Sequence, residues 1–374
     1  MSILKPYAEL SDEQKEFVNS CNDRQGNVFL EGPPWSGKSL TCLYGLQSIV
    51  NKNNTTALFM VTNNAMYGYM SMALKELGIS ENVTVHKKNR FFWEMAGQKR
   101  ISVNLNSDYH DNYNSILCNL LEAEVEKKYS LIIVNEVQDY LPKEWELIKR
   151  ISEKIVCYGD FKQAIYNKKV ERETILNDCI QKELSYHYSD ISTNKLIKVR
   201  NFFLDDSEYL EPREDIPLVQ QLTIDVEYKA IDIKYKDELR TIAEILKALE
   251  GENSRVAIIC PDNNRFAELT IYLASKAIEH SYYEINSDLR KHDFASSKPL
   301  FLSIFNAEGL LFDNVILFGF DKENYIIQMK RQENKLKNLL YVGMTRARNT
   351  TYIIRNENTV EELKGFDAEK CLNC

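Results

Sequence analysis

Short apolar stretches alternate with longer amphipathic stretches along most of the chain. The apolar stretches are rich in β-branched residues, which is typical of strands that are buried on both faces of a parallel sheet. We expect strands at Asn27–Glu31, Ala57–Thr62, Ser130–Val134, Lys154–Tyr158, Arg255–Cys260, Pro299–Ile304, Asn314–Phe318 and Thr351–Arg355.

Between these stretches, apolar residues recur at helical spacing. We expect helices at Leu40–Val50, Glu238–Leu249 and Arg265–Ala277, with Asp262, Asn263 and Asn264 as possible caps of the third. The alternation of strands and helices predicts an α/β fold. The least regular region runs from Asn167 to about Val226, is acidic at Leu204–Asp215, and is expected to join two α/β units.

The overall charge limits how the protein can meet nucleic acid. With 374 residues we expect two domains, at roughly 100–200 residues per domain. The 47 lysines and arginines against 55 aspartates and glutamates give a net charge of −8. This charge excludes a protein that binds nucleic acid over its whole surface. No apolar stretch approaches a membrane span and no signal peptide is visible, so we expect no membrane contact and a cytoplasmic location.

Eight cysteines are scattered through the sequence, as in a reduced intracellular protein. Only Cys371 and Cys374 have the CxxC spacing. One such pair without a second pair or a nearby histidine does not favour a zinc site.

A phosphate-binding loop follows the first expected strand. The residues Gly32, Pro33, Pro34, Trp35, Ser36, Gly37, Lys38 and Ser39 satisfy the pattern GxxxxGK[ST]. Strand, glycine turn and helix N-terminus together direct backbone N–H groups at a phosphate. In this context Lys38 would bind the β- and γ-phosphates of ATP, and the Ser39 hydroxyl would bind Mg²⁺. The alternative is a chance match in an ordinary turn.

A second buried strand ends in acidic residues, in the run Leu131–Asp139. Nucleotide hydrolases place a metal ligand and a water-activating carboxylate at such a strand end. Glu136 is the predicted general base. Asn135 stands where a metal-side aspartate is expected, and its amide oxygen can still face Mg²⁺ or its water shell without carrying charge. We therefore expect slow hydrolysis.

The order of these motifs resembles the UvrD/PcrA/Rep group of superfamily 1 helicases over nearly the whole chain. Leu10–Gln14 resembles the Q motif, Asn135–Asp139 the DExQD box, Gly159–Tyr166 the GDxxQxIY motif and Leu340–Arg348 the YVGxTRA motif. The resemblance implies two RecA-like P-loop NTPase domains with mainly parallel sheets flanked by helices, at residues 1–180 and 181–374.

The resemblance also implies roles for single residues. Gln14 would read the adenine edge, Tyr188 would stack on the base, Gln163 would sense the γ-phosphate and Gly309 would lie at the nucleotide. Arg346 would be the arginine finger. The residues implied at a single strand of nucleic acid, taken as DNA, are Thr62, Asn63, Asn64, His86, Lys87, Lys88 and Tyr166. Tyr188 and Tyr166 can also be interpreted as core aromatics.

The sequence departs from the family pattern at charged positions. Ser189 stands where an arginine is usual, Glu308 replaces a lysine and Leu311 a glutamate, in addition to Asn135. The gaps between motifs leave room for little more than the two sheets, so the large inserted subdomains of full-length relatives are expected to be missing. The pattern therefore predicts the fold more strongly than the full activity.

Two basic clusters run against the acidic average. In His86–Trp93, basic residues stand next to aromatic residues, which suits a nucleic-acid track. The alternative is a helix with its aromatics in the core and its lysines at a solvated edge. Lys330, Arg331, Lys335 and Lys337 form the second cluster, for which a solvated helix face is a more frequent explanation than a contact with phosphate.

Two functions are consistent with these observations. The first is a nucleic-acid-stimulated ATPase, a translocase or weak helicase in DNA metabolism or antiviral defence. The second is a regulatory nucleotide-binding subunit that hydrolyses ATP slowly or not at all and gates a protein partner. Retained Lys38, Glu136, Gln163 and Arg346 favour the first function, whereas the altered charged positions favour the second.

Overall fold

The strands form two separate parallel sheets in the computed structural model, which describes residues 2–21, 26–53, 55–102, 107–185, 190–204 and 226–367. The chain divides into two compact units, Ser2–Ser185 and Tyr186–Cys374. We call them the N-terminal and the C-terminal unit. The boundary expected from the sequence lies after residue 180, and the compact units divide after Ser185.

The N-terminal sheet has the strand order β3-β2-β4-β5-β1-β6, and all of its neighbouring strands are parallel. Its strands are β1 (Val28–Glu31), β2 (Ala57–Val61), β3 (Val83–Lys87), β4 (Leu131–Asn135), β5 (Ile155–Gly159) and β6 (Ile180–Glu183). All residues of the central strands β2, β4 and β5 are buried. Burial on both faces explains why these strands are apolar almost throughout.

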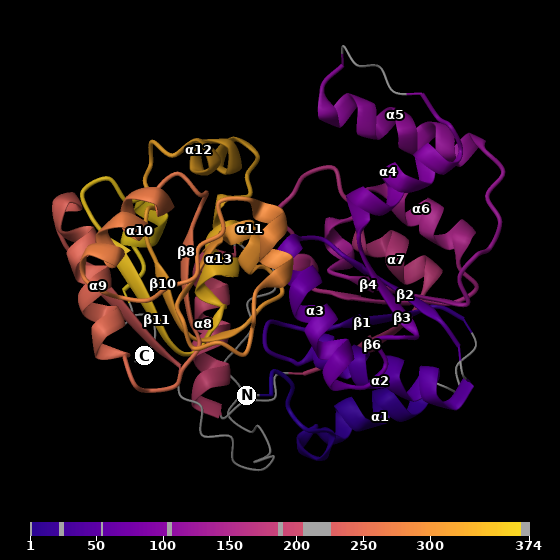
Figure 1. The fold of residues 1–374 in the computed structure, drawn as a ribbon, viewed down its shortest axis with the longest axis horizontal. Coiled ribbons are helices and arrows are strands. Elements are labelled where there is room, and N and C mark those ends of the chain that lie inside the picture. The colour runs from indigo at the N-terminus through magenta and orange to yellow at the C-terminus, as the bar shows by residue number, and fades with distance from the viewer. Residues whose placement is uncertain are drawn as a thin grey trace. The chain divides into compact units, whose positions relative to one another are not determined.

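Helices cover both faces of this sheet (Figure 1). They are α1 (Asp12–Ser20), α2 (Lys38–Asn53), α3 (Asn64–Glu76), α4 (Lys88–Gln98), α5 (Tyr109–Glu122), α6 (Pro142–Ile151) and α7 (Arg172–Asp178). Short 3₁₀ turns lie at Tyr7–Glu9, Val137–Asp139 and Phe161–Gln163. One core joins sheet residues such as Phe29 and Ile132 to Phe92, Leu117 and Ile148 of α4, α5 and α6.

The C-terminal sheet has the order β7-β11-β10-β8-β9, again with parallel neighbours. Its strands are β7 (Glu227–Asp232), β8 (Val256–Cys260), β9 (Leu300–Ser303), β10 (Phe312–Leu317) and β11 (Ala347–Arg355). Its helices are α8 (Asp190–Phe203), α9 (Glu238–Ala248), α10 (Phe266–Ser275), α11 (Ile304–Ala307), α12 (Tyr325–Gln332), α13 (Leu336–Met344) and α14 (Glu361–Lys364), with 3₁₀ turns at Tyr235–Asp237 and Asn286–Lys291. Residues Ile242, Leu246, Phe266 and Leu273 of α9 and α10 pack on the sheet.

These two sheets confirm the predicted fold class, because each is parallel and carries helices. Every strand expected from the sequence has a counterpart, whereas β3, β6 and β7 were not among the expected strands. β6 and β7 are edge strands with mostly exposed or half-buried residues, so neither has a continuous apolar run. The expected cap of α10 is also wrong, since Asp262 accepts a hydrogen bond from the backbone of Asn264, within the preceding turn.

Several sequence-based expectations lie outside the described residues. They concern Cys371 and Cys374, Tyr188 and Ser189, and most of the acidic stretch Leu204–Asp215. Among the described residues, none of the helices combines the length and apolarity that crossing a bilayer requires.

Candidate active site

The candidate residues of the N-terminal unit lie at one edge of its sheet. Because all six strands are parallel, their carboxyl ends point to the same edge, where α/β proteins bind their ligands. β1 leads into the phosphate-binding loop, β4 ends at Asn135, and β5 is followed by Asp160. β2 is followed by Thr62, and β3 ends at Lys87. The chain thus brings its candidate nucleotide and nucleic-acid residues to neighbouring strand ends.

The phosphate-binding loop is closely packed. A Cβ on Gly32 would lie 2.7 Å from Ser36 Oγ and 2.9 Å from the carbonyl oxygen of Leu184, so only glycine fits there. Trp35 and Gly37 have φ angles of 70° and 80°, which give the loop its tight turn before α2 begins at Lys38. Pro34, Trp35 and Ser36 are buried, and Pro33 is half-buried.

The Lys38 ammonium lies within this loop. Its Nζ donates hydrogen bonds to the carbonyl oxygens of Gly32 (2.6 Å) and Pro33 (2.9 Å). The side chain is 8% exposed. A phosphate in the loop would offer charged oxygen atoms, which are stronger acceptors than these carbonyl groups.

Gln14 connects helix α1 to the phosphate-binding loop. It forms a capping box with Ser11 at the start of α1. Its Nε2 donates to the carbonyl oxygen of Ser36 at 2.9 Å, and a Cβ on Gly37 would collide with that nitrogen. The structure therefore places Gln14 beside the loop, with its amide in contact with the loop backbone.

Tyr158 lies beside both predicted metal residues, Ser39 and Asn135. Asn135 is completely buried, and its Nδ2 donates to the Tyr158 hydroxyl at 3.0 Å. Burial raises the pKa of the Tyr158 phenol well above its usual value, and the nearby Ser39 hydroxyl acts in the opposite direction. Asn135 Oδ1 is buried without a hydrogen-bond partner.

These oxygen atoms fit Mg²⁺, which prefers oxygen ligands and keeps several waters beside substrate phosphates. The Ser39 hydroxyl and the unpartnered Asn135 Oδ1 are the groups that would hold the ion or its water. Within the described part of the chain, no cluster of three histidines, cysteines or carboxylates could hold a metal.

A chain of hydrogen bonds connects Glu136 to Gln163. Gln138 Nε2 donates to Glu136 Oε2 at 2.8 Å, and Gln138 Oε1 accepts from the backbone of Asp160 at 3.2 Å. Asp160 Oδ2 in turn accepts from Gln163 Nε2 at 3.0 Å. Burial raises the pKa of the Asp160 carboxyl, while the nearby Lys38 charge acts in the opposite direction. The predicted general base and the predicted phosphate sensor therefore belong to one network.

The backbone at the end of β4 has an unusual conformation. Glu136 adopts a left-handed conformation with φ 50° and ψ 60°, which is uncommon for a residue other than glycine. At the neighbouring strand end, a Cβ on Gly159 would collide with Gln138 Oε1. Glycine at 159 thus lets the Gln138 amide pass over β5 to reach Asp160.

Most candidate nucleic-acid residues lie at the carboxyl ends of β2 and β3, and Tyr166 lies beyond β5. Asn63 caps helix α3 through a 2.8 Å hydrogen bond from the backbone of Met66, and Asn64 is buried in the first turn. Thr62 and His86 are half-buried. Tyr166 is also half-buried, with the Lys169 ammonium 5.2 Å from the centre of its ring.

Lys88 differs from its expected role. It is 7% exposed, its Nζ lies 2.7 Å from Glu144 Oε2, and it also donates to the carbonyl oxygen of Asp139 at 3.0 Å. Burial beside a carboxylate keeps this ammonium inside the unit instead of at a phosphate track. Phe91 and Phe92 are also in the core, so the aromatic half of the basic cluster packs as a core helix does.

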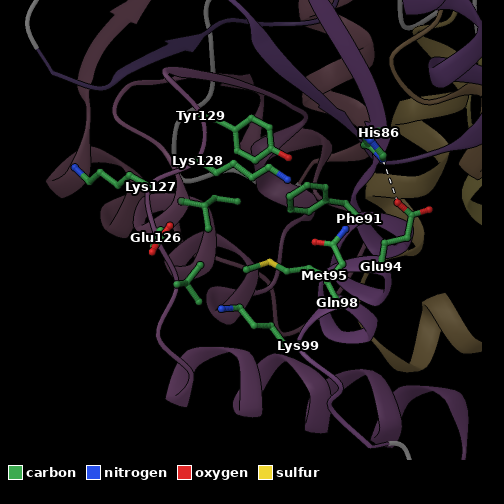
Figure 2. A pocket seen from close by; sticks show the side chains of 12 residues that line it. His86, Phe91, Glu94, Met95, Gln98, Lys99, Glu126, Lys127, Lys128 and Tyr129 are labelled. Carbon is green, nitrogen blue, oxygen red and sulfur yellow. Dashed lines mark ion pairs between the residues drawn. The ribbon is translucent and has the colours of Figure 1, made fainter.

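A cavity of about 580 Å³ lies beside His86, between α4 and residues 125–129. Phe91, Met95, Lys99, Lys128 and Tyr129 line it, and Figure 2 shows these side chains around the space. His86 Nδ1 lies 3.9 Å from Glu94 Oε2 at its rim. The cavity combines aromatic and cationic groups with the carboxylates of Glu94 and Glu126, and His86 is the lining residue that the sequence implied at a nucleic-acid strand.

In the C-terminal unit, Arg346 and the Gly309 turn lie together. The guanidinium is 4% exposed and donates to the carbonyl oxygens of Val342 at 2.8 Å and Leu310 at 3.4 Å. Gly309 has a φ of 81°, which shapes this turn. In the second basic cluster, Lys330 pairs with Glu333 at 2.7 Å and Arg331 with Glu362 at 2.8 Å.

Three residues of this site had no role in the sequence analysis. They are Gln138, Tyr158 and Asp160, whose importance comes from contacts across neighbouring strands. Gln138 and Asp160 stand inside recognised motifs, which was a signal that could have identified them. Tyr158 stands in an apolar strand. The one signal there is that a buried tyrosine hydroxyl usually has a hydrogen-bond partner.

Two family models match the sequence. The model of an AAA domain matches residues 14–169, and that of the UvrD-like helicase C-terminal domain matches residues 285–358. Together with the fold and the phosphate-binding loop, these matches confirm the resemblance to UvrD-like superfamily 1 helicases.

Among solved structures, Arterivirus nonstructural protein 10 (helicase) is similar at 15% identity and a TM-score of 0.41, over 94% of this chain and 64% of that one. The chain therefore spans less than two thirds of the length of that helicase. A comparison with curated proteins finds no match.

Proposed function

We propose that the protein is a nucleic-acid-stimulated ATPase with a UvrD-like motor core, which acts as a translocase or weak helicase in DNA metabolism or antiviral defence. The observation that carries this proposal is the network from Glu136 through Gln138 and Asp160 to Gln163, beside the loop that holds Lys38. In this network, hydrogen bonds connect the Glu136 carboxylate to the Gln163 amide next to the phosphate-binding loop.

In the proposed mechanism, the triphosphate of ATP replaces the carbonyl groups that now accept from Lys38. Gln14 would face the nucleotide from α1, next to the loop backbone that it already contacts. Mg²⁺, held by Ser39 and Asn135, would neutralise charge on the phosphates. Glu136 would orient and deprotonate the attacking water, while the Gln138 amide holds its carboxylate in place.

Gln163 and Arg346 would respond to the γ-phosphate. Gln163 now donates to Asp160, so a phosphate oxygen would compete with a carboxylate for the same amide. Arg346 would add positive charge to the transferred phosphoryl group. For that role its guanidinium would exchange the carbonyl groups of Val342 and Leu310 for phosphate oxygen atoms.

For the nucleic acid, we propose a single strand of DNA along the ends of β2 and β3. Thr62, His86 and Lys87 would lie at this strand. The cavity beside His86 offers Phe91 and Tyr129 to a base and Lys99 and Lys128 to a phosphate, although Glu94 and Glu126 also line it. Lys88 has no part in this proposal because its ammonium pairs with Glu144.

The test is phosphate release with and without single-stranded DNA, for the unchanged chain and for Lys38→Ala. We expect the strand to stimulate hydrolysis and Lys38→Ala to abolish it. The matched control is Lys75→Ala, an exposed lysine of α3 in the same unit, which should hydrolyse ATP as the unchanged chain does. Hydrolysis that persists in Lys38→Ala would refute the assignment of the loop.

The neutral metal residue Asn135 favours a second function, a regulatory subunit that binds ATP, hydrolyses it slowly and gates a protein partner. Nucleotide binding that depends on Lys38, without turnover even when DNA is present, would decide for this alternative.

A further inference from the structure

The inference concerns Tyr158 and rests on the proposed nucleotide site. Tyr158 belongs to β5, whose neighbours in the sheet are β4 and β1. Its side chain is completely buried, its hydroxyl accepts from Asn135 Nδ2 at 3.0 Å, and the Ser39 hydroxyl lies nearby. One phenol therefore lies beside both residues that would face the divalent cation.

The position of Tyr158 matters because a serine hydroxyl that binds a cation needs an acceptor for its proton. A serine that offers its oxygen lone pair to a cation must donate its proton to another acceptor. A phenolic oxygen has two lone pairs, so Tyr158 can accept both the Ser39 proton and the Asn135 amide proton. With those two protons directed at Tyr158, the Ser39 oxygen and Asn135 Oδ1 are both left to the cation.

A second observation points the same way. Asn135 Oδ1 is buried and has no hydrogen-bond partner, although buried polar atoms nearly always have one. The amide is oriented by its Nδ2 contact with Tyr158, which turns this unpartnered oxygen away from the phenol. A cation or its water would satisfy it.

We propose that Tyr158 is a positioning residue of the nucleotide site, which orients Ser39 and Asn135 so that two neutral oxygen atoms face the divalent cation. The site thus uses a phenol and an amide in neighbouring strands in place of a metal-side carboxylate. Tyr158 acts on the cation through its two neighbours and leaves the phosphate contacts of Lys38 unaffected.

The experiment measures the affinity of the full chain for a non-hydrolysable ATP analogue, first in EDTA and then over a range of Mg²⁺ concentrations. In Tyr158→Phe we expect a rise of about tenfold in the Mg²⁺ concentration that gives half of the maximal gain in affinity for the analogue. Other residues that orient metal ligands have effects of this size. Affinity in EDTA should stay within about twofold, because the loop and Lys38 are unchanged.

The matched control is Tyr140→Phe, which removes another buried hydroxyl of the same unit. The Tyr140 hydroxyl has no hydrogen-bond partner in the structure, so both measurements should equal those of the unchanged chain. A Tyr158→Phe chain with unchanged Mg²⁺ dependence would overturn the proposal. So would an equal loss of affinity in EDTA and in Mg²⁺, since that loss indicates only a structural role.

A double-mutant cycle tests whether Tyr158 acts through Ser39. In a Ser39→Ala chain the proton that Tyr158 accepts is absent, so Tyr158→Phe should shift the Mg²⁺ dependence by clearly less than tenfold. Full additivity of the two substitutions would contradict the proposal. Failure of the proposed function would look different, because binding of the analogue in EDTA would then be insensitive to Lys38→Ala.

Discussion

The side chain of Lys88 points into the N-terminal unit, although it stands in a run of basic residues. Its partner Glu144 is completely buried and also accepts from the backbone of Leu141 at 2.7 Å. The sequence shows the charge of Lys88 but not the carboxylate 56 positions further along that neutralises it. This is why the basic run predicted a nucleic-acid contact that the structure does not support at this residue.

We expect Lys88→Ala to lower the free energy of unfolding by about 3–5 kcal/mol, because it leaves the buried Glu144 carboxylate without its cation. Lys87→Ala, at the half-buried residue one position earlier at the end of β3, should lower it by clearly less, because no buried carboxylate is left without its cation. Urea unfolding followed by circular dichroism measures both. Equal stability of the two variants would show that the buried pair contributes nothing.

Asn135 is the second residue whose identity decides a property of the site. In Asn135→Asp the Tyr158 hydroxyl can turn to donate to the new carboxylate, so the contact between the two side chains is kept. A charged oxygen suits Mg²⁺ better than an amide, and we expect phosphate release to rise about tenfold. An equal or lower rate would mean that the site depends on the amide.

At the scale of elements, the strands that carry the site could be predicted and their mutual contacts could not. β1, β4 and β5 are apolar up to their last residues, and motifs mark their carboxyl ends. Gln138 and Asp160 meet only because β4 and β5 are neighbours in the sheet, and the sequence does not show which strands pair. The edge strands β6 and β7 escaped prediction because solvent reaches much of their length.

A substitution at Gly159 tests the contact between Gln138 and Asp160 at the ends of β4 and β5. A methyl group at this position would displace the Gln138 amide, which would separate Glu136 from Asp160. We expect Gly159→Ala to reduce phosphate release at least tenfold while it leaves nucleotide affinity in EDTA nearly unchanged.

The control is Gly97→Ala, since a Cβ on Gly97 of α4 meets no atom within 4 Å. Normal hydrolysis by Gly159→Ala would show that the Gln138 contact has no function.

At the scale of the whole molecule, charge limits the affinity for nucleic acid. The net charge is −8, and several basic side chains are already paired, among them Arg90 with Glu94 and Arg331 with Glu362. The negative net charge and these pairs limit how many counterions the protein can displace from a strand. The sequence also predicts no large inserted subdomain with which to open a duplex.

We expect weak binding of labelled oligothymidylate and poor unwinding of long duplexes. If about two phosphates are neutralised, the dissociation constant should rise roughly sevenfold between 50 and 200 mM salt. Fluorescence anisotropy measures the dissociation constant at each salt concentration, and we expect a weaker salt dependence in Lys87→Ala. A strand-displacement assay measures unwinding. Robust unwinding by the chain alone, indifferent to salt, would contradict this expectation.

The left-handed backbone of Glu136 has a consequence for how this protein could change over time. Glycine adopts such a conformation without steric strain, and selection for stability alone would favour it there. Glu136→Gly should therefore be about as stable as the unchanged chain, although it loses a buried side chain and, by our proposal, all hydrolysis. Selection for stability alone would not keep a glutamate in this conformation. A single substitution at position 136 would therefore be enough to give a stable protein that binds ATP without hydrolysing it.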